Sequence, residues 1–489
     1  MIERYSDKRI EEIWSDSNKL KLWQNSEMAV LLARVKKGEL KQEEYDLICS
    51  SLNENPISIE WWLKRDGEIH HDLNAFVEER LCYIPKHLKI YFHKDMTSYD
   101  TEEPAFAKML QDSTSVVEKD LEVLREILTN MAIKHRYTVM VGRTHGQEAE
   151  LQSFGKRCLC WFQDLGVSLC NLQRTKLNLN YSKMSGAIGN YGSLDPEMEK
   201  EALKSLGFEP YVGSTQIMPR EMYAPIAQAL AQIVSTLNKI ALTVRLGSRS
   251  GLKICQEPFG KKQKGSSAMP HKKNNITGEQ EEAMDRLAKA YARAIMDNIL
   301  TWEERAIEQS AVERVAWPDL FHVTVRAVKN MKKVLGGLVI FPNNMLREII
   351  NLRGCYASNH AKSFLKDNSF QVEDAYRIVQ LAAFNAFLDK ESSIQNSFNF
   401  ADKFVCGEEK MFCRELTSIQ EIIPQGKLRV SSELEADEKK VKRWNSLLIE
   451  LFKDKDILNS WMDLFKPSYL LRNEEHLYSE ILGSNFLGH

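Results

Sequence analysis

The apolar side chains of this sequence recur at helical spacing over long stretches. In five segments they return every three or four positions, at residues 105–133, 154–183, 222–251, 275–306 and 317–341. A helix of 30 residues is about 45 Å long, and rods of that length bury their apolar stripes in a long bundle. The pattern therefore predicts an all-α protein built on a central long-helix bundle.

Shorter helical patterns lie on either side of this region. Residues 8–37 and 42–52 are amphipathic, Pro56 ends that pattern, and residues 444–464 return to helical spacing. A chain of 489 residues also exceeds one ordinary domain. We therefore expect an N-terminal helical domain at 1–104, the central bundle at 105–355, and a C-terminal helical domain with an extension at 356–489.

Composition adds constraints on partners and compartment. The formal net charge is only −2, so no global field steers the chain toward nucleic acid or a membrane surface. No apolar run approaches the roughly 20 residues that span a bilayer, and the first residues do not resemble a signal peptide. The nine cysteines are scattered without a CxxC pattern. These features predict a cytoplasmic protein with reduced thiols and with neither a nucleic-acid nor a membrane partner.

Small side chains mark two of the predicted rods. Their spacing places them on faces that can approach another bundle closely, at Ala227, Ala229, Ala231, Ala288, Ala290 and Ala292. We therefore expect the chain to form oligomers through this region.

The polar break at residues 260–275 is the most distinctive part of the sequence. It contains GSSAMPHKKNN from Gly265 onward, and Pro270 separates it from a strongly helical run that begins at Thr277. A helix start offers free N–H groups and partial positive charge, to which the lysines add. Such a field holds a carboxylate and lowers the pKa of a serine hydroxyl. On charge alone, a solvated basic loop or a nucleic-acid patch is the commoner explanation.

Histidines stand in two other polar breaks. His70 and His71 precede Asp72, and such a group can act as an acid/base pair. His145 lies between Thr144 and Gly146, at the mouth of the next predicted helix, where it is placed to titrate. Taken alone, each is more often an ordinary surface or turn histidine.

Two further groups of polar residues bear on substrate binding. Thr97 and Ser98 stand at a loop-to-helix junction, where hydroxyls ordinarily cap helices. Arg305 and Arg314 lie nine residues apart near a helix end with Ser310 between them. Two guanidinium groups and a hydroxyl suit a phosphate monoester, whereas Glu/Arg pairs on a solvated helix face are the ordinary alternative.

The loop at 265–275 is similar to the signature loop of the fumarase/aspartase superfamily, GSSxMPxKxN. Other segments resemble, in the correct order, motifs of its adenylosuccinate lyase family. They are found at residues 70–73 (RHDV), 97–100 (TSxD), 142–155 (GRTHGxxAExxxFG), 185–192 (SGAVGTYA), 214–221 (STQxxxRD), 302–314 (WHERDxxHSSVER) and 372–380 (EAYxxVQ). The resemblance covers roughly residues 1–385 and implies a three-domain, all-α lyase fold that assembles into a homotetramer.

The resemblance also implies roles for individual residues. Ser266 is the expected base, His145 the general acid and His71 its supporting histidine, while Lys272 holds a carboxylate and Glu279 orients a histidine. Substrate contacts are expected from Arg4, Tyr5, His70, Asp72, Thr97, Ser98, Gln216, Ser267, Lys272, Asn274, Arg305, Ser310 and Arg314. Asp100 is expected to be structural. Departures from the family pattern include His70 for arginine, Ala306 for aspartate and Gln309 for histidine.

The implied reaction is cleavage of adenylosuccinate to AMP and fumarate, and of the related succinylaminoimidazole carboxamide ribotide. It needs no metal or organic cofactor, and the family builds each active site from three subunits. Three alternatives remain, of which a nucleic-acid binder would need more than one basic loop on a near-neutral chain. A carboxymuconate cycloisomerase acts on an unphosphorylated acid and has no use for Arg305 and Arg314, and a catalytically silent helical scaffold needs none of the catalytic residues.

Overall fold

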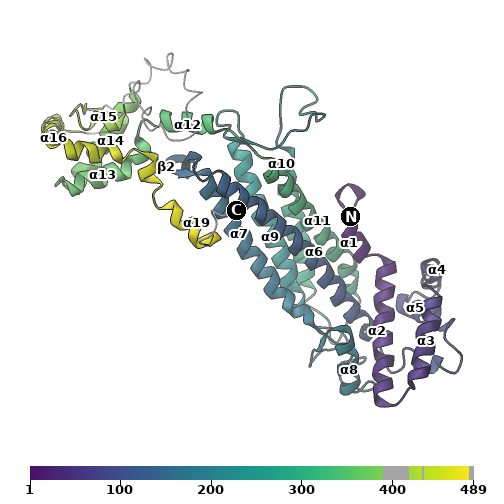
Figure 1. Cartoon of the computed structure of the whole chain (residues 1–489). Coiled ribbons are helices and arrows are strands. Elements are labelled where there is room, and N and C mark those ends of the chain that lie inside the picture. The colour runs from purple at the N-terminus through teal and green to yellow at the C-terminus, as the bar shows by residue number, and fades with distance from the viewer. Residues whose placement is uncertain (389–417, 432–433, 435, 484–489) are drawn as a thin grey trace. The chain divides into compact units, whose positions relative to one another are not determined.

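The computed structural model describes residues 1–388, 418–431, 434 and 436–483, most of which are helical (Figure 1). The chain forms two compact units, each assembled from separate segments. The first consists of Met1–Arg125, Asp164–Thr243 and Gly260–Gly336, and the second of Glu126–Gln163, Val244–Phe259 and Gly337–His489. The three-domain division expected from the sequence stays a prediction.

Long helices dominate the first unit, which contains the greater part of each of them. They are α6 (Ser98–Lys134), α7 (Phe154–Lys176), α9 (Ala224–Gly247), α10 (Ile276–Asp297) and α11 (Glu308–Gly336). Figure 1 shows α6, α9, α10 and α11 running side by side, and α10 and α11 pack closely along their lengths. The predicted all-α fold with a long-helix bundle is confirmed.

The N-terminal part of the first unit is made of shorter helices that share a core around Trp23, Trp62 and Phe76. Ser15 interrupts the helix predicted at 8–37, because its hydroxyl accepts the Asn18 N–H at 3.2 Å and caps a new helix. The elements are η1 (Glu3–Tyr5), α1 (Lys8–Ile13), α2 (Asp16–Lys37), α3 (Gln42–Glu54), α4 (Ile59–Ile69), α5 (Asp72–Leu81) and η2 (Lys89–Tyr91).

Several predicted boundaries are wrong, and prolines explain two of them. Pro104 and Pro318 stand next to the starts predicted at 105 and 317, but both lie inside helices, so α6 begins at Ser98 and α11 at Glu308. A proline removes one backbone hydrogen bond without ending a helix that is packed along its whole length. The helix predicted at 275–306 ends at Asp297, and the one predicted at 154–183 ends at Lys176. Ser310 therefore lies in the first turn of α11.

Short elements complete the first unit. η3 (Leu177–Asn180) leads into β3 (Tyr181–Ser182), which pairs in parallel with β4 (Glu209–Pro210). Between these strands, α8 (Pro196–Leu206) packs against α2, and η4 (Arg220–Met222) precedes α9.

The second unit has its own core around Trp444, Trp461 and Phe465. Its hairpin pairs β1 (Val139–Thr144) with β2 (Gln147–Ser153), and β5 (Cys255–Gln256) pairs antiparallel with β6 (Val339–Ile340). The helix predicted at 444–464 is two helices, α16 and α17. The remaining elements are α12 (Pro342–Asn351), η5 (Cys355–Ala357), α13 (Ser358–Asp367), α14 (Val372–Leu388), α15 (Ile419–Ile422), α16 (Glu438–Leu451), α17 (Lys455–Asp463), α18 (Pro467–Leu470) and α19 (Glu474–Leu482).

The alanines that were expected to face another bundle are mostly buried within the chain. Ala227, Ala229, Ala231, Ala288 and Ala292 are each at most 8% exposed, and only Ala290 of this set is exposed. Small side chains let helices of one chain approach closely, so these positions are used within the chain itself. The expected oligomerisation stays a prediction that these residues do not support.

Two further observations concern the described residues as a group. The seven cysteines among them are free thiols. None of the helices in this part of the chain is long and apolar enough to cross a bilayer.

The contact between α7 and α19 gives a test of packing in the second unit. A Cβ atom on Gly155 would lie 2.4 Å from the Ala132 carbonyl oxygen and 2.1 Å from the Tyr478 hydroxyl, which itself donates to that carbonyl at 3.1 Å. Gly155→Ala should therefore lower the free energy of unfolding by roughly 1–3 kcal/mol through overpacking. Gly67→Ala is the control, because a Cβ on this helical glycine meets nothing within 4 Å. Thermal unfolding that leaves Gly155→Ala as stable as Gly67→Ala would contradict this packing.

Candidate active site

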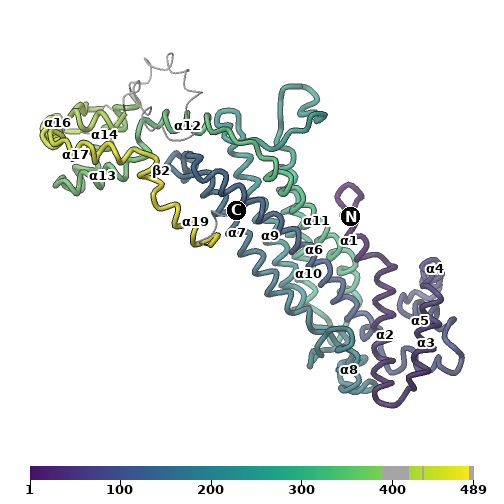
Figure 2. The backbone as a smooth tube through the Cα atoms, in the orientation of Figure 1, coloured from purple at the N-terminus to yellow at the C-terminus, as the bar shows by residue number. Residues whose placement is uncertain are grey.

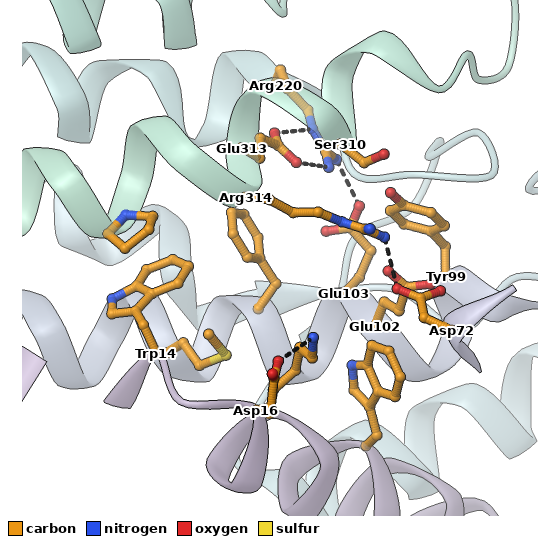
Figure 3. Close-up of a pocket in the computed structure, with 15 residues that line it drawn as sticks. Trp14, Asp16, Asp72, Tyr99, Glu102, Glu103, Arg220, Ser310, Glu313 and Arg314 are labelled. Carbon is orange, nitrogen blue, oxygen red and sulfur yellow. Dashed lines mark hydrogen bonds and ion pairs between the residues drawn. The ribbon is translucent and has the colours of Figure 1, made fainter. Parts of the chain in front are cut away.

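A cavity of about 320 Å³ opens within the first unit (Figure 3). Its wall is aromatic and apolar on one side and strongly charged on the other. The residues that line it are Trp14, Asp16, Lys19, Trp23, Asp72, Tyr99, Glu102, Glu103, Phe106, Met109, Arg220, Ser310, Glu313, Arg314 and Pro318. Of the residues expected from the sequence to bind substrate, Asp72, Ser310 and Arg314 are gathered here.

The charged wall is fixed by Arg220, which is 3% exposed. Its guanidinium donates to Glu313 through two bonds of 2.9 Å and to Glu103 at 2.6 Å. Burial alone lowers the pKa of Arg220, but the two carboxylates outweigh it and hold the pKa well above its usual value. Tyr223 and Gln309 donate to the same carboxylates, at 3.0 and 2.6 Å. This network joins α6, the start of α9 and α11.

The polar end of the cavity is held by a weaker pair. Arg314 donates to the Asp72 carboxylate at 2.7 Å, and the Arg314 side chain is 60% exposed. Exposed pairs of this kind contribute about 1 kcal/mol or less, so a ligand anion can displace Asp72. Ser310 donates its hydroxyl proton to the Ile307 carbonyl at 3.0 Å and lies one helical turn before Arg314. The first two turns of α11 therefore present a hydroxyl and a guanidinium to the cavity.

Glu102 also lines this end of the cavity. Burial raises its pKa to about 8, the Asp72 carboxylate adds to the rise, and Arg314 and Arg305 oppose it. Burial, together with Glu102, raises the pKa of the adjacent Tyr99 to about 12, against the opposing effect of Arg305. At neutral pH the Glu102 carboxyl group is therefore mostly protonated.

Arg305 and Gln216 line a second cavity of about 300 Å³ in the same unit. Arg305 donates to the Gln216 side-chain oxygen at 3.0 Å, and Gln216 donates to the Ala187 carbonyl at 3.0 Å. The Arg305 guanidinium also stacks 4.2 Å from the centre of the Tyr99 ring. The two arginines expected to hold one phosphate thus line different cavities. Tyr99 lines the first cavity and stacks on Arg305, which lines the second.

The segment that carries Thr97 and Ser98 is anchored by a buried ion pair. Asp100 accepts the Thr97 N–H at 2.9 Å and binds the Lys183 ammonium at 2.7 Å, and both charged side chains are fully buried. Lys183 also donates to the carbonyls of Gly186 and Gln216. The arrangement agrees with a structural role for Asp100, and it ties the start of α6 to the Gln216 segment.

Four other candidates lie outside both cavities. His70 ends α4 in a left-handed conformation, with φ of 53°, and His71 caps α5 by accepting the Asn74 N–H at 3.2 Å. No hydrogen bond joins His70 to His71, which are both described residues. The structure therefore does not show the acid/base pair that their adjacency suggested. Arg4 and Tyr5 form η1, where the Tyr5 ring stacks against Arg326.

Ser266 and Lys272, two of the residues expected to perform the chemistry, lie on a loop. Figure 2 traces residues 260–275 as a loop that projects from the N-terminal end of α10. The Ser266 hydroxyl accepts the Met269 N–H at 3.1 Å, and Asn274 donates to the Gly265 carbonyl at 3.0 Å. A Cβ on Gly265 would lie 1.8 Å from the Lys272 carbonyl oxygen, so the loop ends cross at a point that only glycine permits. Ser267, Lys272 and Glu279 are exposed, and Glu279 contacts no histidine among the described residues.

His145 was expected at the mouth of a helix, and that expectation is wrong. It lies in the second unit, at the tip of the β1–β2 hairpin. His145 and Gly146 have φ of 54° and 77°, as in a two-residue turn whose twist matches its strands. The imidazole is exposed.

Sequence reasoning missed several residues that shape the site. Glu102 and Glu103 were assigned no role, yet both belong to the first turns of α6 and line the cavity. Arg220 belonged to a recognised motif without an assigned role. Trp14 and Trp23 gave no signal, because aromatic residues at helical spacing are usually core residues.

The Arg220 network predicts a large and specific loss of stability. Arg220→Met should lower the free energy of unfolding by about 3–5 kcal/mol, because it leaves two buried carboxylates without their counter-charge. Arg293→Met is the matched control: its i,i+4 pair with Asp297 is exposed, so the change should cost no more than about 0.5 kcal/mol. Equal denaturation midpoints for the two variants would show that the network does not support the fold.

The comparisons with known proteins agree with this architecture. A family model described as "Lyase" matches residues 1–290. The chain is 35% identical over 387 residues to the adenylosuccinate lyase of Synechocystis sp., covering 79% of this chain and 89% of the relative. The adenylosuccinate lyase of Aquifex aeolicus is 33% identical, with 79% and 88% covered, and that of Bacillus subtilis is 31% identical, with 79% and 89% covered.

Solved structures support the fold independently of sequence. A fumarate lyase from Mesorhizobium sp. BNC1 matches with a TM-score of 0.78 at 20% identity, covering 99% of this chain and 100% of that chain. A 3-carboxy-cis,cis-muconate lactonizing enzyme from Pseudomonas putida matches with a TM-score of 0.77 at 17% identity, with 99% and 98% covered. These likenesses show the fold alone, whereas the closer sequence relatives identify the branch. The chain is a lyase and belongs to the adenylosuccinate lyase family of the fumarase/aspartase superfamily.

Proposed function

We propose that this enzyme eliminates fumarate from adenylosuccinate to give AMP, and from succinylaminoimidazole carboxamide ribotide, in purine biosynthesis. The observation that carries the proposal is the placement of Ser310 and Arg314 on the first turns of α11, facing a cavity. A helix N-terminus favours a phosphate group through its free N–H groups and its dipole. The names of the relatives support the same substrate.

The phosphate has to compete for Arg314 with one half-buried carboxylate, that of Asp72, in a pair whose arginine is exposed. The charge-assisted hydrogen bonds from Arg314 and Ser310 to a phosphate dianion contribute more free energy than is lost when the partly exposed ion pair breaks. Arg305, stacked on Tyr99, lies next to this seat and holds Gln216. A cycloisomerase acting on an unphosphorylated acid has no use for such a seat, which disfavours that alternative.

In the proposed mechanism Ser266 removes a proton from the carbon next to the one that bears nitrogen. Its hydroxyl oxygen accepts the Met269 N–H, and this bond favours the alkoxide form that a base requires. Lys272 and Asn274 hold the carboxylate onto which the carbanion charge spreads, with Ser267 beside them. The C–N bond then breaks, and His145 protonates the departing nitrogen. His71 assists His145, and Glu279 orients a histidine. The products are fumarate and the amino nucleotide.

The remaining substrate contacts are proposed from Arg4, Tyr5, His70, Thr97 and Ser98. We further propose a homotetramer whose active sites are shared between subunits. Ser266 belongs to the first unit of the chain and His145 to the second. The free thiols of the described residues suit a reducing, cytoplasmic setting.

The first test of the proposal is fumarate release from adenylosuccinate, followed at its ultraviolet absorbance. Ser266→Ala should bind substrate nearly as well as the parent yet lose most of kcat, because the change removes a contact made only in the transition state. Ser446→Ala is the control and should keep parental turnover, because that hydroxyl is exposed on α16 and donates to the Lys442 carbonyl. A Ser266→Ala enzyme with parental kcat would remove Ser266 from the mechanism, and a parent enzyme that releases no fumarate would refute the proposed function.

The phosphate seat is tested through KM. Arg314→Ala should raise KM for adenylosuccinate about 10- to 150-fold, since charge-assisted hydrogen bonds contribute about 1.5–3 kcal/mol. Arg286→Ala is the control, because that arginine is 77% exposed on α10, where it forms an i,i+4 ion pair with Glu282. An unchanged KM in Arg314→Ala would place the phosphate elsewhere.

Shared active sites predict complementation. His145→Ala and Ser266→Ala should each be inactive alone and regain activity after they are unfolded and refolded together. Random mixing of chains restores at most roughly a quarter of parental activity, because only some sites receive one intact copy of each residue. Light scattering has to show that oligomers re-form. Re-formed oligomers without fumarate release would mean that both residues act from one chain.

A further inference from the structure

Glu102 is set apart from the other charged residues that line the first cavity. Arg220 is bound by Glu103 and Glu313, Lys19 by Asp16 at 2.8 Å, and Arg314 by Asp72. Glu102 makes no hydrogen bond or ion pair with the residues that the structure describes. A carboxyl group that faces a cavity without a partner is available to a ligand.

The surroundings of Glu102 oppose a negative charge on it. Figure 3 shows Glu102, Asp72 and Tyr99 grouped around the end of the Arg314 side chain. Asp72, from α5, is a carboxylate held by Arg314, and Glu103 is the next residue along α6. The cations that face Glu102 are Arg314 and Arg305, and each is already engaged by another side chain. Burial and these neighbours together raise the pKa of Glu102 to about 8.

A phosphate ligand strengthens this opposition. When a phosphate oxygen takes Arg314 from Asp72, the cavity gains a dianion and Asp72 loses its counter-charge. A second carboxylate at Glu102 would then face two anions at short range. A neutral carboxylic acid at the same position instead donates an O–H hydrogen bond to one of them.

We propose that Glu102 is a binding residue that acts as a neutral carboxylic acid, so that the enzyme binds the phosphate of its nucleotide together with one proton. The proton stays on the Glu102 carboxyl group and is donated in a hydrogen bond to the anionic end of the site. The ligand is bound without any covalent bond to it being made or broken. The inference rests on the proposed function, because it takes a nucleoside monophosphate as the ligand of this cavity.

Linkage gives the sign of the pH dependence. Only the protonated form of Glu102 binds well, so affinity is constant while Glu102 is protonated in the free enzyme and falls about tenfold per pH unit above pH 8. The second ionisation of a phosphate monoester, near pH 6, is complete in this range, so the ligand itself does not change charge. Tyr99, with a pKa raised to about 12, stays neutral throughout.

The experiment measures the dissociation constant of AMP by titration calorimetry between pH 7 and pH 9.5. The parent enzyme should lose about tenfold in affinity per pH unit above pH 8, whereas Glu102→Gln, which mimics the neutral acid, should hold its affinity nearly constant. Calorimetry at pH 8.5 in buffers of different ionisation enthalpy should show proton uptake on binding by the parent and none by Glu102→Gln. Glu122→Gln is the matched control, since it removes an exposed carboxylate from the same helix and should behave as the parent does.

Two results would overturn the inference: an affinity for AMP in the parent that does not change across pH 8, or an equal fall in Glu102→Gln. Either can occur in an enzyme that releases fumarate from adenylosuccinate, in which case the proposed function stands and only the role of Glu102 is lost. A parent enzyme that neither binds AMP nor releases fumarate would instead refute the proposed function. Glu102→Ala adds a second check, because it removes the donor and should weaken AMP binding at pH 7, where Glu102→Gln does not.

Discussion

The first unit depends on one buried guanidinium. Arg220 contacts Glu103 on α6 and Glu313 on α11, and it stands two residues from Met218, whose carbonyl accepts from the same side chain at 2.7 Å. An uncompensated charge in this position would cost several kcal/mol of folding free energy. The segment that carries Arg220 therefore holds α6 and α11 in register, and the two ion pairs are expected to break together. Tyr99 and Glu102 precede Glu103 by one turn or less, and Ser310 and Arg314 flank Glu313. The arginine thus sets where these cavity residues lie.

The ion pairs of this unit fall into two kinds with different uses. Those of Arg220 and Lys183 are buried and connect segments far apart in the chain, so they fix the backbone that carries Tyr99, Thr97 and Gln216. The pair between Arg314 and Asp72 is partly exposed, so its partners can be exchanged at little cost. A site that binds a dianion needs both kinds: a rigid wall, and a cation that is held in position until the ligand replaces its carboxylate.

The sequence predicted the bodies of the helices well, but it predicted helix ends, turns and long-range side-chain contacts less well. The apolar period identified the bodies of α6, α9 and α10 because packing along a bundle repeats every turn. The starts predicted at 105 and 317 lie too late in the chain, because tertiary packing keeps Pro104 and Pro318 inside α6 and α11. The His145 turn was missed since its two left-handed residues are histidine and glycine rather than the usual Asn-Gly pair. The motifs named Arg305, Ser310 and Arg314, but no local pattern shows that Arg220 meets carboxylates 93 and 117 residues away. The unpaired state of Glu102 depends on that same distant pairing.

The two ends of the proposed site differ in how complete they are within one chain. The proposed phosphate seat is a formed cavity, whose walls are set by buried contacts and whose charged residues other than Glu102 are paired. Of the residues proposed for the chemistry, His145 is exposed on a hairpin tip and Lys272 is exposed on a loop. The hydrogen bonds of Ser266 and Asn274 stay within that loop. Stabilising a carbanion requires a site from which water is excluded, because fixed charges act more strongly there than in solvent. Exposed catalytic groups do not meet that requirement until something covers them, and under the proposed function the cover is supplied by substrate and neighbouring subunits.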